Sequence, residues 1–314
     1  MARNSVQLQK GLSITTFLEQ YGTEEQCHDA LVRMKWPEGV VCPECGCKDH
    51  CQLKNRKLFQ CNECHHQTSV RVGTIYQGSG TPLTRWFLVS YALTQGKTSI
   101  STLELARFTG LTPKTADLIR KKLAQVMEER DAEKKLAGRI EIDDAYMGGK
   151  NIGGKRGRGS ENKTPFVAVV ETTASGAPLR IQLRVVEGFS SEALENYAKS
   201  SLEPGSHVLS DGLPCFRAVT KAGCTHEPKV TTGNKELADS VFKWVNTIIG
   251  NLKTATAGTF HGISEKYLHH YLAEFEYRFN RRYKLGDMIE RLVYVALRTP
   301  PRTEKFIRMA ETMV

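Results

Sequence analysis

The sequence predicts a multidomain protein of the α/β class, on three observations. Residues 36–75 are rich in Cys and in short extended runs, whereas residues 10–35 and 82–135 carry apolar residues at helical spacing. From Arg139 onward, strand-like and helix-like segments alternate. Hairpin strands come first in this last zone and strand–helix alternation follows, a pattern that predicts a mixed sheet with helices packed on it.

The composition is that of an ordinary globular protein with a basic excess. Hydrophobic residues make up 40% of the 314 residues and charged residues 25%, which excludes wholesale disorder and allows about two or three domains. The formal charge of +10 favours a polyanionic partner without requiring one. The sequence has no apolar run of about 18 residues and no signal-peptide stretch at its N-terminus, so we expect a cytoplasmic protein without a membrane span.

Two C-x2-C pairs predict a metal site. Cys42 and Cys45 form the first pair, Cys61 and Cys64 the second, and fifteen residues separate the pairs. Each pair can place two thiolates on one tight turn, so the two turns supply four ligands for tetrahedral Zn²⁺. Because four cysteines leave no position for water, we expect a structural zinc ion in a zinc ribbon over residues 36–76.

The other cysteines leave alternatives open. Nine Cys is an odd number in a chain without an export signal, which argues against a disulfide framework. Cys47 and Cys51 lie near the first pair and could compete as ligands, while Cys27, Cys215 and Cys224 are typical of small core residues. The alternative to zinc is four incidental buried cysteines.

Residues 101–122 are typical of a helix-turn-helix, within a DNA-binding region that we expect to span residues 81–135. The first helix is expected to bury Leu103, Ala106 and Phe108. The turn and the start of the second helix are predicted from Gly110, a capping Thr112 and Pro113 at the first helical position. Basic side chains of the second helix suit DNA phosphates: Lys114, Arg120, Lys121 and Lys122. A plain structural helix pair is the alternative.

The last zone is predicted in detail by its turns and caps. Strands are expected over Arg139–Tyr146, Pro165–Thr173, Pro178–Glu187, His207–Ser210 and His226–Val230. Helices are expected over Ser191–Leu202, Leu213–Ala222, Glu236–Thr254 and Lys266–Asn280.

Two aspartates stand where a sheet exposes its side chains. Asp143 interrupts the first strand of the last zone, and Asp211 follows the short strand His207–Ser210. Carboxylates that lie close together on rigid strands repel one another unless a cation lies between them, and Mg²⁺ prefers such hard oxygen ligands. The alternative for each residue is a turn former or a helix cap.

The order of these features resembles that of the DDE insertion-sequence transposases that carry an N-terminal zinc ribbon. Local matches are Cys61–Tyr76, Glu141–Lys150, Gly258–Gly262 and Tyr271–Arg282, and the resemblance covers the chain from about Trp36 to Arg282. It implies a catalytic domain over residues 136–290 with a ribonuclease H-like, integrase-type core. Residues 1–35 would then form an N-terminal helical segment and residues 291–314 a C-terminal tail.

The resemblance also implies catalytic residues and their cofactor. The family's third ligand lies on the helix after the last core strand, and here Asn246 stands 35 positions after Asp211, with Lys253 seven positions later. Asp143, Asp211 and Asn246 would hold two Mg²⁺ (or Mn²⁺) ions, and Lys253 would contact a phosphate. The alternatives are a solvent-facing helix residue for Asn246 and a solvated surface lysine for Lys253. The family's usual residue is Glu, so nearby carboxylates stay open as substitutes: Glu236, Asp239, Glu265 and Glu274.

The implied partner is double-stranded DNA, both element ends and target, bound by a homodimer or higher oligomer in a nucleoid-associated protein. The loop Lys150–Lys163 could clamp a DNA backbone through Lys155, Arg156 and Arg158, helped by Arg278, Arg281 and Arg282. Such runs are also common as plain solvated surface. Two rival functions remain: a non-catalytic, domesticated DNA-binding protein, and a structure-specific nuclease on the same fold.

Overall fold

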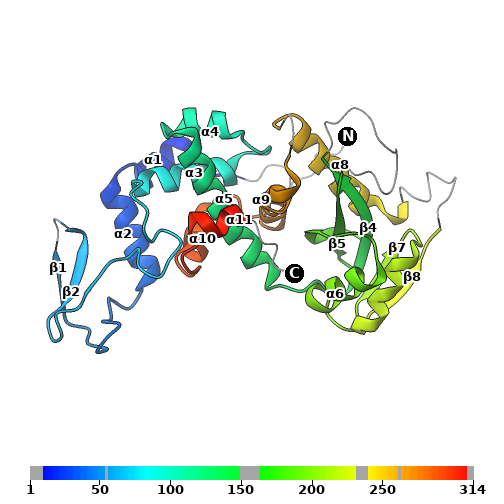
Figure 1. Cartoon of the computed structure of the whole chain (residues 1–314), viewed down its shortest axis with the longest axis horizontal. Coiled ribbons are helices and arrows are strands. Elements are labelled where there is room, and N and C mark those ends of the chain that lie inside the picture. The colour runs from blue at the N-terminus through cyan, green and yellow to red at the C-terminus, as the bar shows by residue number, and fades with distance from the viewer. Residues whose placement is uncertain (1–9, 54–55, 149–162, 231–239, 261–262, 310–314) are drawn as a thin grey trace. The chain divides into compact units, whose positions relative to one another are not determined.

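The computed structural model describes residues 10–53, 56–148, 163–230, 240–260 and 263–309 (Figure 1). The chain divides into two compact units. Unit 1 comprises Met1–Gly96, Thr102–Val126 and Tyr283–Arg308, and unit 2 comprises Lys97–Ser101, Met127–Arg282 and Met309–Val314. Within the described ranges, no helix combines the length and the hydrophobicity that a membrane crossing needs.

Unit 1 is built mainly from helices. They are α1 (Ile14–Tyr21), α2 (Glu24–Lys35), α3 (Leu83–Gln95), α4 (Thr102–Thr109), α10 (Met288–Ala296), α11 (Glu304–Met309) and the first part of α5 (Pro113–Ala132). Thr23 and Gln26 form a capping box at the start of α2, which satisfies two backbone N–H groups. Helix α10 packs on α2 and α3. Residues 291–314, which we expected to be a C-terminal tail, contain α11 and the second part of α10, and α10 belongs to the core of unit 1.

The zinc ribbon is a small antiparallel sheet in unit 1. Its strands β1 (His50–Leu53), β2 (Leu58–Cys61) and β3 (Gln67–Thr68) lie in the order β1-β2-β3. Phe59 of β2 is 6% exposed, and its ring contacts those of His28, Trp36 and His50. So small an apolar core does not stabilise a fold of this size without help.

The turn of the helix-turn-helix has the predicted conformation, whereas the first helix buries other residues than we expected. Gly110 has φ +69°, and the hydroxyl of Thr112 accepts a hydrogen bond from the backbone N–H of Thr115 at 3.3 Å. Helix α4 buries Leu105, Ala106 and Thr109. The expectation that Leu103 and Phe108 are buried is wrong, since they are 60% and 44% exposed. The buried residues of α4 follow the spacing i, i+1 and i+4, and Leu103 and Phe108 lie outside this buried stripe.

Unit 2 is a five-stranded mixed sheet in the order β6-β5-β4-β7-β8. Its strands are β4 (Arg139–Met147), β5 (Thr164–Thr172), β6 (Pro178–Val185), β7 (His207–Ser210) and β8 (Thr225–Pro228). The first three pair antiparallel, whereas β7 runs parallel to β4 and β8 parallel to β7. This order and these directions are those of a ribonuclease H-like sheet, as the resemblance implied.

Helices cover both faces of this sheet (Figure 1). Helix α6 (Ser191–Ser201) and the 3₁₀ helix η3 (Pro214–Ala222) pack on the face that carries Ile140 and Ile142 of β4. Helices α8 (Lys243–Ala257) and α9 (Leu268–Asn280), the latter preceded by η4 (Glu265–Tyr267), pack on the face that carries Ala145 and Met147. Side chains alternate across a strand, so odd-numbered residues of β4 point toward α8 and even-numbered ones toward α6.

Candidate functional site

The sheet register brings the two predicted aspartates together. On the parallel strands β4 and β7, Glu141 is the partner of Leu209. Asp143 stands two residues after Glu141 within β4, and Asp211 stands two residues after Leu209, just past the end of β7. The two aspartates therefore occupy equivalent positions along the two neighbouring strands. One carboxylate oxygen from each lies within 4.8 Å of the other, as does one from Asp144. Three acidic side chains therefore converge at the carboxyl end of β7.

Asp144 is a member of this group that sequence reasoning did not single out. Asp143 is opposite Ala168 on β5, within the face that packs against α8, whereas Asp144 is opposite Val167 on the face toward α6. The backbone N–H of Asp144 donates to Oδ1 of Asp143 at 2.8 Å. The sequence did contain the signal, two consecutive Asp residues in one strand, but only Asp143 was singled out.

Backbone contacts hold Asp211 in a tight turn. Its Oδ1 accepts a hydrogen bond from the backbone N–H of Leu213 at 3.0 Å. The preceding Ser210 hydroxyl accepts from the N–H of Gly212 at 3.2 Å and lies 2.9 Å from Nε2 of His226 on β8. Gly212 has φ +91°, a conformation that favours glycine. Asp211 thus acts as a turn former and also faces Asp143, so the two interpretations of this residue are compatible.

Helix α8 begins over β4 because a buried carboxylate holds its first turn. Oε2 of Glu141, a residue 1% exposed, accepts hydrogen bonds from the backbone N–H groups of Trp244 and Val245 at 3.0 and 3.1 Å. The guanidinium of Arg139 lies 3.0 Å from Oε1. Glu141 and Asp143 are two residues apart on β4 and point to the same face of the sheet. The first turn of α8, which Glu141 holds, therefore lies on the same face as Asp143.

Asn246 and Lys253 lie on the solvent side of α8. Both are exposed, while Val245, Ile248 and Leu252 of the same helix are buried against the sheet. A spacing of seven residues places the two side chains on one stripe, two turns apart. A Cβ added at Gly250, between them, would meet nothing within 4 Å. The exposure of both side chains is also what solvent-facing residues of a helix show.

The other carboxylates considered for the third ligand have different positions. Glu236 and Asp239 lie outside the described residues. Glu265 is exposed in η4, and Glu274 of α9 is 1% exposed. Neither Glu265 nor Glu274 belongs to the acidic group formed by the described residues around Asp143. Asn246 remains the candidate that the spacing predicts.

The four ribbon cysteines converge as the two C-x2-C pairs predict. Their sulfur atoms lie within 4.8 Å of one another, with Cys42 3.5 Å from Cys64 and Cys45 3.5 Å from Cys61. Four thiolates around one zinc ion stand about 3.8 Å apart, given Zn–S bonds of about 2.3 Å, so this set fits the metal. Cys47 and Cys51 are outside this set, and Cys47 Sγ accepts from the N–H of Asp49 instead.

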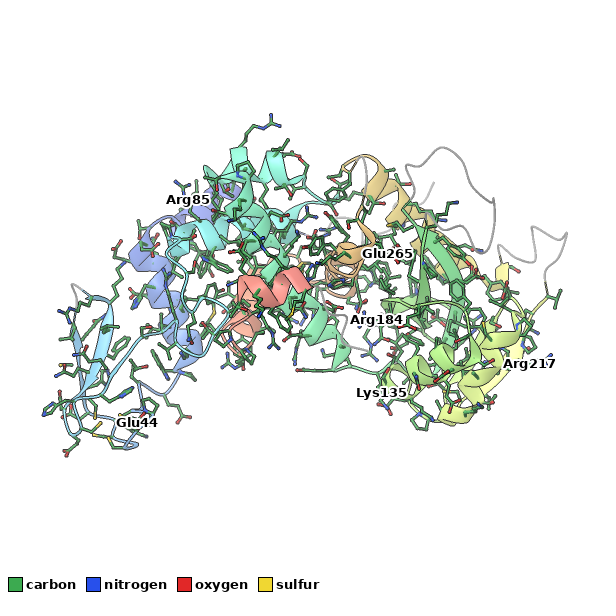
Figure 2. All side chains as sticks on the ribbon, in the orientation of Figure 1. Glu44, Arg85, Lys135, Arg184, Arg217 and Glu265 are labelled. Atoms are coloured by element: carbon green, nitrogen blue, oxygen red, sulfur yellow. The ribbon has the colours of Figure 1, made fainter. Side chains whose placement is uncertain are left out.

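Backbone amides prepare the turns of the ribbon for thiolates. Gly46 and His65 occupy equivalent places after the two pairs, with φ +73° and +57°. The backbone N–H of Cys45 lowers the pKa of the Cys42 thiol, and the N–H groups of Cys64 and Glu63 help to lower that of Cys61 to about 6. The pKa values of the Cys45 and Cys64 thiols are raised, because hydrogen bonds among the four sulfur atoms favour one protonated partner in each contact. Glu44, inside the first turn, is labelled in Figure 2. Lowered thiol pKa values favour the thiolate, which is the form that binds metal.

The predicted DNA-binding residues of α5 have unequal access to solvent. Lys114 has a 76% exposed side chain, 3.8 Å from Glu304. Lys121 forms an ion pair with Asp117 at 2.7 Å, and its side chain is 18% exposed. Arg120 is 3% exposed, so its burial argues against a phosphate contact. Lys155, Arg156 and Arg158 lie outside the described residues.

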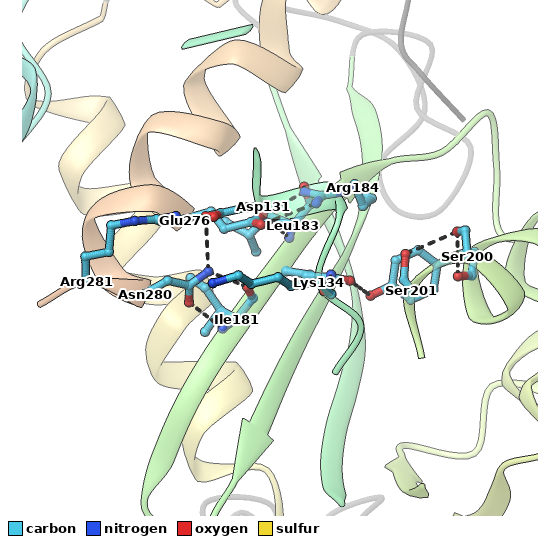
Figure 3. A network of polar contacts seen from close by, with 12 residues as sticks. Asp131, Lys134, Ile181, Leu183, Arg184, Ser200, Ser201, Glu276, Asn280 and Arg281 are labelled. Atoms are coloured by element: carbon cyan, nitrogen blue, oxygen red, sulfur yellow. Dashed lines mark hydrogen bonds and ion pairs between the residues drawn. The ribbon is translucent and has the colours of Figure 1, made fainter. Parts of the chain in front are cut away.

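The arginines at the end of α9 make contacts within unit 2. Arg278 is 8% exposed, and Arg281 forms an ion pair with Asp131 at 2.6 Å. Arg282 donates to the backbone carbonyls of Pro178 and Leu179 on β6. Figure 3 shows Arg281 reaching Asp131 beside Asn280 and Glu276. These contacts give the three arginines structural roles within unit 2, and a contact of theirs with DNA stays a prediction.

The arrangement defines a class: a zinc-ribbon protein with a ribonuclease H-like sheet and paired acidic residues at its centre. Residues 135–280 match the model of the ISXO2-like transposase domain, and residues 22–67 match that of the transposase zinc-ribbon domain. The chain thus carries a transposase domain of the IS1595 family behind a transposase zinc ribbon. The helix-turn-helix lies between the two matched ranges.

Known proteins similar to the chain come from transposable elements. An uncharacterized protein in transposable element ISH50 of Halobacterium salinarum is 25% identical over 134 residues, which are 41% of this chain and 44% of that protein. The match therefore spans less than half of the relative's length.

Two solved structures of Mos1 transposase assemblies are also similar, a pre-cleavage transpososome and a paired-end complex with the left transposon end. Their identities are 12% and 14%, and they cover 69% and 71% of this chain and 80% and 82% of their own chains. Both TM-scores are 0.25, too low to support an argument. The strand order of unit 2 defines the fold by itself.

Proposed function

We propose that this chain is an active DNA transposase that binds the terminal inverted repeats of its insertion sequence, cleaves the ends and joins the 3′-hydroxyls to target DNA. The single observation that carries the proposal is the register of β4 and β7, which sets Asp143 beside Asp211 with α8 anchored above them through Glu141. An acidic pair on rigid strands suits chemistry that depends on positioning and electrostatics.

Asp143, Asp211 and Asn246 would hold Mg²⁺ or Mn²⁺, since carboxylate and amide oxygens are the ligands that these cations prefer. When bound, the metal ions supply activation of the attacking oxygen and charge stabilisation of the leaving oxygen in phosphoryl transfer. The chain itself contributes a rigid donor set, because β4 and the turn after β7 fix both carboxylates. Lys253, on the stripe of Asn246, would bind a phosphate near the scissile bond. An amide ligand brings no charge, so we expect weaker metal binding than with Glu.

The zinc ribbon and the helix-turn-helix would bind DNA. Zn²⁺ held by Cys42, Cys45, Cys61 and Cys64 would stabilise the ribbon, because its own apolar core is small. Lys114 has the exposure that a phosphate contact needs. Lys155, Arg156 and Arg158 remain candidates from sequence alone. Pairing of two DNA ends would require a dimer or a higher oligomer.

The test is cleavage of the element's own terminal DNA with Mg²⁺ or Mn²⁺. We expect Asp143→Asn and Asp211→Asn each to lower the rate of cleavage at the ends by about a thousandfold or more, because each removes a charged ligand. Asp29→Asn is the matched control, because it makes the same change at an aspartate of unit 1 whose side chain is 64% exposed, and this variant should cut normally. Asp144→Asn should reduce cleavage less than Asp143→Asn, since Asp144 points to the opposite face.

Asn246→Ala separates the possibilities for the third ligand. Loss of cleavage would support Asn246, whereas retained cleavage would move the ligand to a nearby carboxylate. Tight binding of the ends without cleavage in either metal would contradict the enzyme and leave a DNA-binding protein. Cleavage of branched or hybrid substrates, without need for a terminal repeat, would favour the structure-specific nuclease.

A further inference from the structure

A second cluster of metal-ligand side chains lies inside unit 2, away from the acidic group. Glu128 projects from the end of α5, and His269 and His270 project from α9. Their exposed fractions are 8%, 5% and 3%. One carboxylate oxygen and one ring nitrogen from each histidine lie within 4.8 Å of one another. The cluster is thus fully inside the fold, unlike a set of surface charges.

Two of these groups have polar atoms that the surrounding fold does not satisfy. Among the described residues, neither Oε2 of Glu128 nor Nε2 of His269 has a hydrogen-bond partner, although both atoms are buried. They lie 3.9 Å apart, too far for a hydrogen bond between them. Buried polar groups are almost always paired in native proteins, so an unsatisfied carboxylate facing an unsatisfied imidazole points to a missing ligand.

Burial shifts the pKa of both unsatisfied groups away from the charged form. It lowers the pKa of His269 to about 4 and raises the pKa of Glu128 to about 7. Arg184, whose charge acts on Glu128 in the opposite sense, forms an ion pair with Glu276 at 2.7 Å. The geometry of the cluster carries the inference, because it places three buried metal-ligand side chains within 4.8 Å of one another.

We propose that Glu128, His269 and His270 bind a divalent transition-metal ion, Zn²⁺ being the first candidate, at a site separate from both the zinc ribbon and the acidic group. Two imidazoles and one carboxylate are a donor set that zinc and related borderline metals prefer, while Mg²⁺ prefers oxygen alone. Donors around tetrahedral zinc stand about 3.4 Å apart, so small side-chain rotations close the gap from 4.8 Å. The ion ties the end of α5 to α9.

Metal content of the full-length protein tests this site directly. The purified chain is loaded with Zn²⁺, dialysed, and analysed by inductively coupled plasma mass spectrometry. We expect two tightly bound equivalents in the wild type and one in Glu128→Gln, an isosteric change that removes the carboxylate charge. Glu133→Gln, five residues further along the chain with a 63% exposed side chain, is the matched control and should keep two. Asp143→Asn should also keep two, which separates this site from the acidic group.

Cobalt spectroscopy identifies which ligands hold each equivalent. With Co²⁺ in place of Zn²⁺, Cys45→Ser should lose the thiolate-to-metal charge-transfer bands and keep the weaker visible bands of a nitrogen–oxygen site. His269→Asn should keep the thiolate-to-metal charge-transfer bands and lose the weaker visible bands of the nitrogen–oxygen site. One equivalent in the wild type, or a second equivalent that Glu128→Gln and His269→Asn both retain, overturns the proposal; in that case Glu128 and the histidines form a neutral polar cluster. The wild-type count is decisive even if a variant fails to fold.

Discussion

Glu141 shows how much one buried side chain contributes to the site. It is 1% exposed, accepts two backbone N–H groups of α8 and forms an ion pair with Arg139. A helix N-terminus carries a partial positive charge, so an ionised carboxylate stabilises it more than a neutral cap does. The sequence displayed Glu141 only as one residue of a strand. Its role depends on a helix that begins about a hundred residues later, which no local pattern reveals.

Replacing Glu141 tests whether this cap positions α8, the helix that carries the proposed residues Asn246 and Lys253. We expect Glu141→Ala to lower the free energy of unfolding by about 2–4 kcal/mol, because two N–H groups and the Arg139 guanidinium lose a buried partner. End cleavage should fall about tenfold or more even at temperatures where the variant is folded, since α8 carries Asn246 and Lys253. Urea denaturation and single-turnover cleavage measure the two effects.

Glu192→Ala is the matched control, because Glu192 is also an acidic residue in the first turn of a helix but is exposed. It should cost about 0.5 kcal/mol and leave cleavage unchanged. If Glu141→Ala loses stability but cleaves normally at low temperature, the cap is structural only and α8 does not need this anchor for chemistry.

At the scale of elements, α9 protects the edge of the sheet. Among the described residues, β6 is an edge strand of the five-stranded sheet, and no further strand pairs with its outward side. The N–H of Ile181 donates to Oδ1 of Asn280 at 2.8 Å, the carbonyl of Ile181 accepts from Nδ2 of Asn280 at 3.0 Å, and the N–H of Leu183 donates to Glu276 at 2.9 Å (Figure 3). Side chains of a helix thus take the place of a sixth strand, which blocks edge-to-edge association.

Asn280→Ala should therefore open this edge. Loss of two hydrogen bonds, with the Ile181 groups left partly buried, is expected to cost about 2 kcal/mol. Hydrogen exchange at the Ile181 amide should accelerate by about tenfold or more, and the variant should aggregate at lower concentration. Asn251→Ala, an exposed amide on α8, is the control and should change neither. Unaltered exchange at Ile181 would mean that the hydrogen bonds to Asn280 do not protect the edge.

A comparison of the elements with the sequence patterns shows which of them the sequence could predict and which it could not. The strands of unit 2 were predicted because turn and cap signals mark their ends, and the convergence of the four ribbon cysteines because the C-x2-C spacing decides it. The phase of α4 was wrong because Leu103, Ala106 and Phe108 are apolar without lying on one helical face. The role of Arg281 could not be predicted, since it depends on Asp131, about 150 residues earlier. Asp144 was missed because its neighbour Asp143 satisfied the pattern alone.

At the scale of the whole molecule, the two units have separate reasons to fold. Unit 2 buries apolar side chains on both faces of its sheet, with Ile142 and Val169 on one face and Ala168 and Leu209 on the other. The ribbon of unit 1 has strands of four, four and two residues and only a small aromatic cluster around Phe59. We therefore expect zinc binding to supply most of the ribbon's stability, whereas the sheet of unit 2 has an apolar core of its own.

Removing the ribbon's metal should consequently affect one part of the chain. In Cys45→Ser we expect hydrogen exchange of peptides from β1 and β2 to lose protection by about a hundredfold or more, because an unfolded ribbon exposes every strand amide. Peptides from β4 and β5 should exchange as in the wild type, since their cores contain no ribbon residue. Cys51→Ser, which changes an exposed cysteine outside the four-sulfur group, should leave both regions protected. A protected ribbon in Cys45→Ser would show that Phe59 and its neighbours suffice without metal. Loss of protection that reached β4 would show that the units fold as one, and the separation argued from their cores would be wrong.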